Sequence, residues 1–71
     1  MEGSIYKIID VVGTSKKSWE EAAKNAVETA GQTLEDLRVG EIVKLDMTIN
    51  NGKVELYRAR VNISFKYRAG D

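Results

Sequence analysis

β-branched and aromatic residues dominate the first apolar segment of the chain. Residues 5–12 read Ile-Tyr-Lys-Ile-Ile-Asp-Val-Val, and Gly13-Thr14-Ser15 follow directly. Residues of the first kind are enriched in strands, whereas glycine and small hydroxyl residues mark turns. The pattern therefore predicts a strand over 5–12 with a turn directly after it.

A helical pattern comes next. Ser18 is followed three residues later by Glu21, which is the spacing of a capping box at a helix N-terminus. Apolar side chains then recur at steps of three and four, namely Trp19, Ala22, Ala23, Ala26, Val27, Ala30 and Leu34. We predict a helix over 18–34 whose small residues lie close to a sheet. Gly31 marks either close packing or an early end.

Beyond residue 38 the apolar period changes from helical to two, which predicts strands over 39–49 and 53–67. Odd-numbered positions form the mainly apolar face of both strands, and Glu41 is the acidic exception among those of 39–49. We interpret Glu41 as an edge position, with an ion or salt-bridge site as the alternative.

The connection between these two strands sets their register. A two-residue Asn51-Gly52 loop would place Leu45 opposite Arg58 and mix the two faces, because opposite residues share a face. A three-residue loop, 50–52, instead pairs Leu45 with Tyr57. The same register pairs Val43 with Ala59 and Val39 with Ile63. We predict the three-residue loop.

These elements predict a single α+β domain over residues 1–71, with an antiparallel sheet that carries one helix on its apolar face. At ~3.3 Å per residue the two long strands span about 35 to 45 Å, whereas the helix spans about 25 Å at ~1.5 Å per residue. One helix cannot cover such a sheet. Other copies of the same chain are the simplest partners that could cover the rest of the sheet.

The amino-acid composition excludes several classes of function. The 71 residues include no Cys, His or Pro, which excludes disulfides, thiol nucleophiles and histidine-based catalysis or zinc sites. We expect no enzyme. The net charge is zero, but residues 1–36 carry −3 and residues 37–71 carry +3, which favours self-association over nucleic acid. Apolar runs are too short for a signal peptide or membrane span, so we expect a cytoplasmic protein.

Four segments together are similar to the dodecin family over residues 5–67. They are 6–15, Ser18-Trp19-Glu20, Leu37-Arg38-Val39 and Ser64-Phe65-Lys66. The resemblance implies a β-α-β-β protomer in which a curved three-stranded antiparallel sheet wraps the helix. It also implies that twelve protomers form a hollow shell, a homododecamer.

Well-known members of this family store or scavenge flavins such as FMN or riboflavin at protomer interfaces. The resemblance places their stacking Trp at Val39 and their hydrogen-bonding Gln at Arg58. Val39 offers no aromatic platform, so stacking worth about 0.5–1.5 kcal/mol is lost. The chain instead resembles a branch that lacks this Trp and is described as calcium-binding.

Calcium requires six to eight oxygen ligands, which an interface can gather from several chains. The candidate ligands are the acids of the strands, namely Asp10, Glu41, Asp46 and Glu55. Asp46 has the alternative of a cross-strand ion pair with Arg58. The bases Arg58, Arg60, Lys66 and Arg68 either bind phosphate or pair with acids of neighbouring protomers. A structural or partner-binding assembly without a small ligand is a further alternative.

Overall fold

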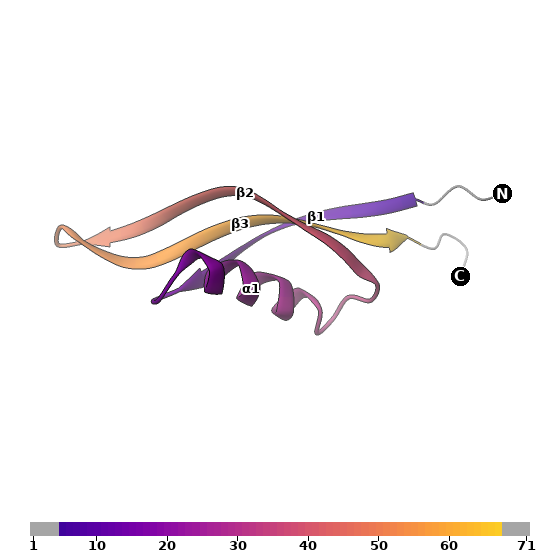
Figure 1. The fold of residues 1–71 in the computed structure, drawn as a ribbon, viewed down its shortest axis with the longest axis horizontal. Coiled ribbons are helices and arrows are strands. Elements are labelled where there is room, and N and C mark those ends of the chain that lie inside the picture. The colour runs from indigo at the N-terminus through magenta and orange to yellow at the C-terminus, as the bar shows by residue number, and fades with distance from the viewer. Residues whose placement is uncertain (1–4, 68–71) are drawn as a thin grey trace.

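One helix packs on a three-stranded antiparallel sheet in the computed structural model, which describes residues 5–67 (Figure 1). The elements follow in the order β1 (Ile5–Ser15), α1 (Trp19–Ala30), β2 (Leu37–Asn50) and β3 (Lys53–Tyr67). β3 is the central strand, between β1 and β2. The predicted β-α-β-β order and the antiparallel α+β class are thus confirmed. Residues 1–4 and 68–71 of the proposed single domain, Arg68 among them, lie outside the described residues.

Two predicted element ends are wrong. β1 does not turn at Gly13, because Gly13, Thr14 and Ser15 continue the ladder opposite residues 57–59 of β3. α1 ends at Ala30 rather than Leu34, since Gly31 is its C-cap and donates its N–H to the Val27 carbonyl. The early end considered for Gly31 is the one that occurs. β2 also begins earlier than predicted, at Leu37.

The start of α1 is held by two serines. Ser18 is the N-cap, and its hydroxyl accepts a hydrogen bond from the Glu21 N–H at 3.0 Å. Glu21 does not complete the predicted reciprocal box, because its carboxylate instead accepts the hydroxyl of Ser15. Ser15 in turn accepts the N–H groups of Lys17 and Ser18. The last residue of β1 therefore closes the turn into α1.

The core lies where α1 crosses β1 and β3. A Cβ built on Gly13 would lie 2.0 Å from the Ala22 carbonyl oxygen and 2.8 Å from the Ala26 Cβ. Glycine at this position allows the helix to approach the sheet. The buried hydrophobic residues among those described are few and small: Ala22, Ala26, Ala59, Val61 and Ile63. The predicted close packing of helix on sheet is confirmed.

The β2–β3 hairpin turns in two residues, so the predicted three-residue loop is wrong. Asn50 pairs with Lys53, and Asn51 and Gly52 have φ angles of 54° and 73°. Two consecutive positive φ values are typical of the hairpin turn that Asn-Gly favours. A bulge between Thr48 and Ile49 then shifts the register, which pairs Leu45 with Ala59 rather than with Tyr57. The apolar faces match because of the bulge and not because of the loop.

A second bulge, at Val43, reverses the faces of β2. Val43 has no partner in the register, so that Gly40 pairs with Ile63 and Glu41 pairs with Asn62. The predicted pairs of Val43 with Ala59 and Val39 with Ile63 are therefore wrong. A Cβ on Gly40 would lie 3.4 Å from the Val27 Cγ2, which places Gly40 on the helix side. Val39 and Glu41 consequently lie on the opposite side of the sheet, away from α1.

The sheet extends well beyond the helix at both ends (Figure 1). Trp19 connects α1 to the hairpin arm, since its Nε1 donates to the Asp46 carbonyl at 2.9 Å and its ring lies edge-on to Tyr57 at 5.0 Å. Trp19 therefore packs the start of α1 against the hairpin arm. Within residues 5–67 no helix is both long and apolar enough to span a bilayer.

Candidate functional site on the outer face of the sheet

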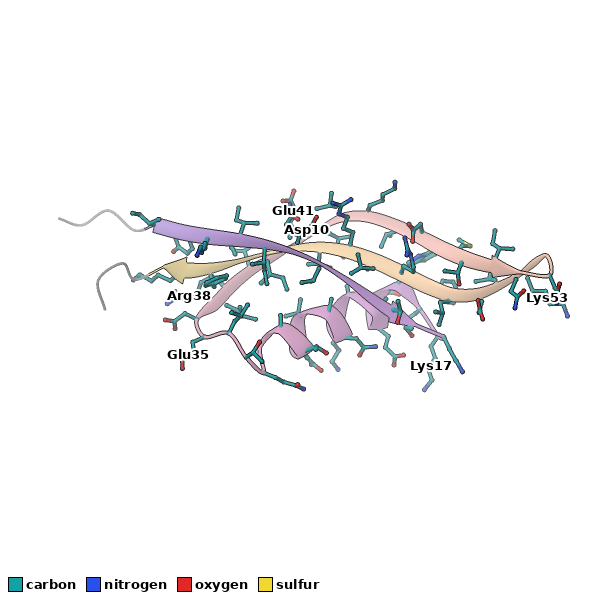
Figure 2. All side chains as sticks on the ribbon, turned by 180° about the vertical axis from the view of Figure 1, so that it is seen from behind. Asp10, Lys17, Glu35, Arg38, Glu41 and Lys53 are labelled. Atoms are coloured by element: carbon teal, nitrogen blue, oxygen red, sulfur yellow. The ribbon has the colours of Figure 1, made fainter. Side chains whose placement is uncertain are left out.

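The candidate residues gather on the sheet face opposite α1, which we call the outer face. Three neighbouring rows cross all three strands there, because opposite residues in an antiparallel ladder share a face. In the order β1, β3, β2 the rows are Thr14-Arg58-Asp46, Val12-Arg60-Lys44 and Asp10-Asn62-Glu41. Figure 2 shows Asp10 and Glu41 together on this side, with the helix on the other. The described structure leaves this charged surface uncovered.

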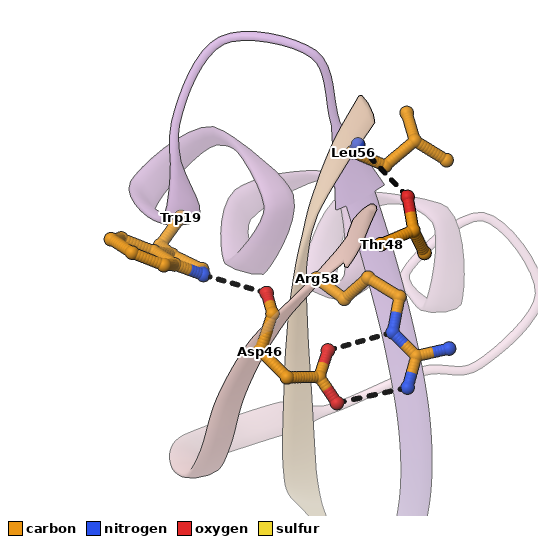
Figure 3. A network of polar contacts seen from close by, with 5 residues as sticks. All are labelled: Trp19, Asp46, Thr48, Leu56 and Arg58. Carbon is orange, nitrogen blue, oxygen red and sulfur yellow. Dashed lines mark hydrogen bonds and ion pairs between the residues drawn. The ribbon is translucent and has the colours of Figure 1, made fainter. Parts of the chain in front are cut away.

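Asp46 and Arg58 form a bidentate ion pair across β2 and β3. Nε of Arg58 donates to Oδ1 at 2.7 Å and Nη2 donates to Oδ2 at 2.9 Å (Figure 3). These hydrogen bonds hold the pKa of Asp46 below its ordinary value, and nearby Lys44 lowers it slightly further. The cross-strand pair considered from the sequence is the arrangement found in the protomer.

Asp10 and Arg60 form the second ion pair, across β1 and β3. Arg60 is opposite Val12, so its side chain reaches diagonally to Asp10, and Nε lies 2.9 Å from Oδ2. Hydrogen bonds from Arg60 are the main reason that the pKa of Asp10 is lowered. Both side chains are about half exposed. Such exposed pairs chiefly orient the two arginines, because solvent screens their attraction.

Of the four candidate calcium ligands, the fold brings two together. Asp10 and Glu41 flank Asn62, one on each side of β3, in a row of oxygen-bearing side chains. Asp46 lies four residues further along β3, or about 13 Å at ~3.3 Å per residue. Glu55 lies at the bulge near the hairpin tip and is exposed. Within residues 5–67 no three acids group closely enough to hold a metal ion.

The two positions at which the resemblance places the flavin contacts are far apart in one protomer. Val39 pairs with Ser64 and is 60% exposed, whereas Arg58 pairs with Asp46. Ser64 and Arg58 are six residues apart on β3, which is about 20 Å at ~3.3 Å per residue. Arg58 also commits two of its nitrogens to Asp46. A ligand that touches both positions would need more than one chain.

Two residues of the outer face were missed from the sequence, Asn62 and Lys44. Asn62 joins Asp10 and Glu41 in one row, and Lys44 is opposite Arg60. The place of Lys44 opposite Arg60 depends on the register shift between Thr48 and Ile49. The row of Asn62 depends on the register shift at Val43 and on the pairing of β1 with β3. Asn62 was visible as the single amide on the basic side of β3, but its neighbours were not.

A separate groove of about 780 Å³ runs between β1 and α1. It is lined by Ile9 and residues 11–14 of β1 and by residues of 25–34, and none of the lining side chains is charged. β1 is an edge strand of the sheet, so backbone groups along the groove have no strand neighbour on that side. The groove offers apolar surface and uncharged hydrogen-bonding groups, and no carboxylate lines it.

Comparison with known proteins gives a consistent result. The Dodecin family profile matches residues 5–68. Calcium dodecin from Mycobacterium tuberculosis is 42% identical over 65 residues, which are 92% of each chain. The crystal structure of that calcium-chelating antigen, which has a calcium-binding site, matches with a TM-score of 0.82 over 96% of this chain and 97% of its own. Dodecin from Streptomyces coelicolor matches at 30% identity with a TM-score of 0.91, over 99% and 100% of the two chains.

Proposed function

This chain belongs to the dodecin family, and from that premise we propose that it forms a homo-oligomeric, non-enzymatic shell that binds calcium or a similar cation at protomer interfaces. The calcium-chelating relative at 42% identity supports the choice of ion. We further propose twelve copies and a cytoplasmic location.

The row Asp10-Asn62-Glu41 on the outer face is the main observation in support of cation binding. Carboxylate and amide oxygens are the ligands that hard cations prefer. One row offers fewer oxygens than the six to eight that calcium takes, and Asp10 already pairs with Arg60. Equivalent rows of neighbouring protomers would complete the coordination where they meet at a symmetry axis.

The exposed apolar surface supports the assembly. Eleven large hydrophobic residues of the described chain are substantially exposed, and they lie along both edge strands and on the hairpin arm. The uncharged groove beside β1 adds a further surface of this kind. Partner chains would remove this surface from water at roughly 25 cal/mol per Å².

Native mass spectrometry of the full chain tests the assembly. Twelve protomers of 7.9 kDa predict a species of about 95 kDa. Excess mass that disappears in chelator would identify bound metal, whereas a yellow protein with flavin absorbance would favour the flavin-storage alternative. A monomer would contradict the interface site.

Thermal unfolding in calcium tests the residues. A ligand that binds the folded state raises the melting temperature, and we expect this for the wild type in calcium. Glu41→Gln should abolish most of the rise. Glu28→Gln, an exposed acid on α1, is the matched control and should keep it. An equal calcium response in all three proteins would exclude the outer row, and no response would favour an assembly without a small ligand.

A further inference from the structure

Two positively charged residues lie directly opposite each other on the outer face, although this arrangement is unfavourable. Lys44 is directly opposite Arg60 in the β2–β3 register. Like charges directly opposite in a sheet are destabilising, whereas the neighbouring row places Asp46 opposite Arg58 and is favourable. Arg60 turns away from Lys44 toward Asp10 on the other side of β3. Arg60 is thus paired with Asp10, whereas Lys44 forms no ion pair within residues 5–67.

A small hollow of about 110 Å³ lies at this point of the surface. Its lining is Val12, Lys44, Asp46, Arg58 and Arg60. These residues carry a net charge of +2, or +1 when Asp10, the partner of Arg60, is included. The strands thus bring three cationic side chains from two neighbouring rows around one concave site.

The two ion pairs leave donors available at the hollow. Each arginine uses Nε and Nη2 for its aspartate, and Figure 3 shows the third nitrogen of Arg58 pointing away from Asp46. Within residues 5–67 no hydrogen bond reaches Nη1 of either arginine or Nζ of Lys44. The aspartates fix the guanidinium planes, so these donors are ordered before a ligand arrives.

We propose that this hollow binds a small oxyanion of the phosphate class, held by Lys44 and by the Nη1 groups of Arg58 and Arg60. The anion neutralises the repulsion between Lys44 and Arg60. Pockets for drug-sized ligands are roughly 300 Å³ or larger, so a hollow of about 110 Å³ accepts one phosphoryl group rather than a whole nucleotide. The group is either inorganic phosphate or the terminal phosphate of a larger molecule that extends into solvent.

Isothermal titration of the full-length protein with inorganic phosphate tests this site. The titration is made in chelator and at constant ionic strength, so that neither calcium nor general screening contributes. We expect saturable binding to the wild type. Lys44→Gln should weaken it about tenfold or more, because a charge-assisted hydrogen bond is lost. Lys44→Arg should retain binding, and Lys53→Gln, an exposed lysine at the hairpin turn, is the matched control.

A second readout separates a ligand site from a structural role. In chloride buffer without phosphate, Lys44→Gln should melt at the wild-type temperature or above it, because the like-charge pair is gone. Phosphate should then raise the melting temperature of the wild type and of Lys53→Gln, but not that of Lys44→Gln. Equal responses of all variants, or no binding by the wild type, would overturn the proposal.

Glycerol 3-phosphate distinguishes the two sources. Tighter binding of the ester than of inorganic phosphate would indicate a phosphorylated organic ligand, and the reverse order would indicate free phosphate. Both orders support the site. Since no calcium is present, failure here would leave the proposed cation site untouched, and failure of the calcium experiments would leave this one untouched.

Discussion

Gly13 is the residue at which sheet and helix come closest. Its missing side chain leaves room for the backbone of α1, since an added Cβ would lie 2.0 Å from the Ala22 carbonyl oxygen. The conflict is with backbone, which cannot rotate aside as a flexible side chain can. Its backbone has no positive φ, so the requirement for glycine here is one of space alone.

Gly13→Ala should therefore destabilise the protein by about 3 kcal/mol, at the upper end of the usual cost of overpacking. Gly31→Ala is the control within the same chain. Gly31 has a helical φ of −66°, and an added Cβ there meets nothing closer than 3.5 Å. It should be neutral or stabilising by roughly 0.5–1 kcal/mol. Denaturant unfolding followed by circular dichroism measures both, and equal effects would contradict the packing argument.

At the scale of the elements, the sequence predicted which segments form strands and helix but not how β2 lies against β3. The period-two pattern gave both strands, and Ser18 gave the start of α1. The pattern assumed an unbroken alternation, whereas bulges at Val43 and next to Ile49 interrupt it. A bulge inserts a residue and is not marked by residue type here, so the faces of residues 39–42 were assigned the wrong way round.

For the same reason, the arrangement of the candidate site could not be predicted from the sequence. Asp10, Glu41 and Asp46 could be named from the sequence as acids on strands, and the Asp46–Arg58 pair could be considered. That Asp10 and Glu41 flank Asn62, and that Lys44 faces Arg60, follows only from the three-strand register. The long-range pairing of β1 with β3 determines which residues are neighbours at the site. Local sequence patterns do not specify that pairing.

The cross-strand ion pairs predict how stability depends on pH. The pKa values of Asp10 and Asp46 are lowered by hydrogen bonds from their arginines. A carboxyl group whose pKa is lower folded than unfolded stabilises the fold above its unfolded pKa, about 3.9 for Asp. That contribution is lost as the pH falls through the folded pKa.

Melting temperature measured from pH 6 down to pH 2 checks this expectation. Asp46→Asn should flatten the acid limb of the curve relative to the wild type. About 1 M salt should flatten the wild-type curve in the same direction, since the pairs are partly exposed and the Debye length is then about 3 Å. An acid limb unchanged by both would show that the pairs do not contribute.

At the scale of the whole molecule, the protomer is more extended than a typical globular monomer of its size. Its accessible surface is 5471 Å², against about 4400 Å² for a typical folded monomer of this mass. Its radius of gyration is 14.7 Å, against about 11 Å for a compact chain of this length. The excess surface includes the exposed apolar residues of the edge strands. Stability should therefore depend on other copies of the chain.

The denaturation midpoint should rise with protein concentration, because association with other folded chains shifts the equilibrium by mass action. For a large homo-oligomer each tenfold increase in concentration adds about 1 kcal/mol per chain. Urea titrations over a hundredfold range of concentration measure this. A monomer would show superimposable curves, which would contradict the assembly.

The place of β3 in the sheet determines when the fold can form during synthesis. In the sheet of residues 5–67, β3 pairs with both other strands, and it is made after β1, α1 and β2. Until it leaves the ribosome, neither β1 nor β2 has a partner strand, and long-range pairing of this kind is slow. The nascent chain therefore exposes two unpaired strand edges, which are prone to aggregation. The complete sheet can therefore form only after β3 has been synthesised, and the edges of β1 and β2 stay unpaired during that interval.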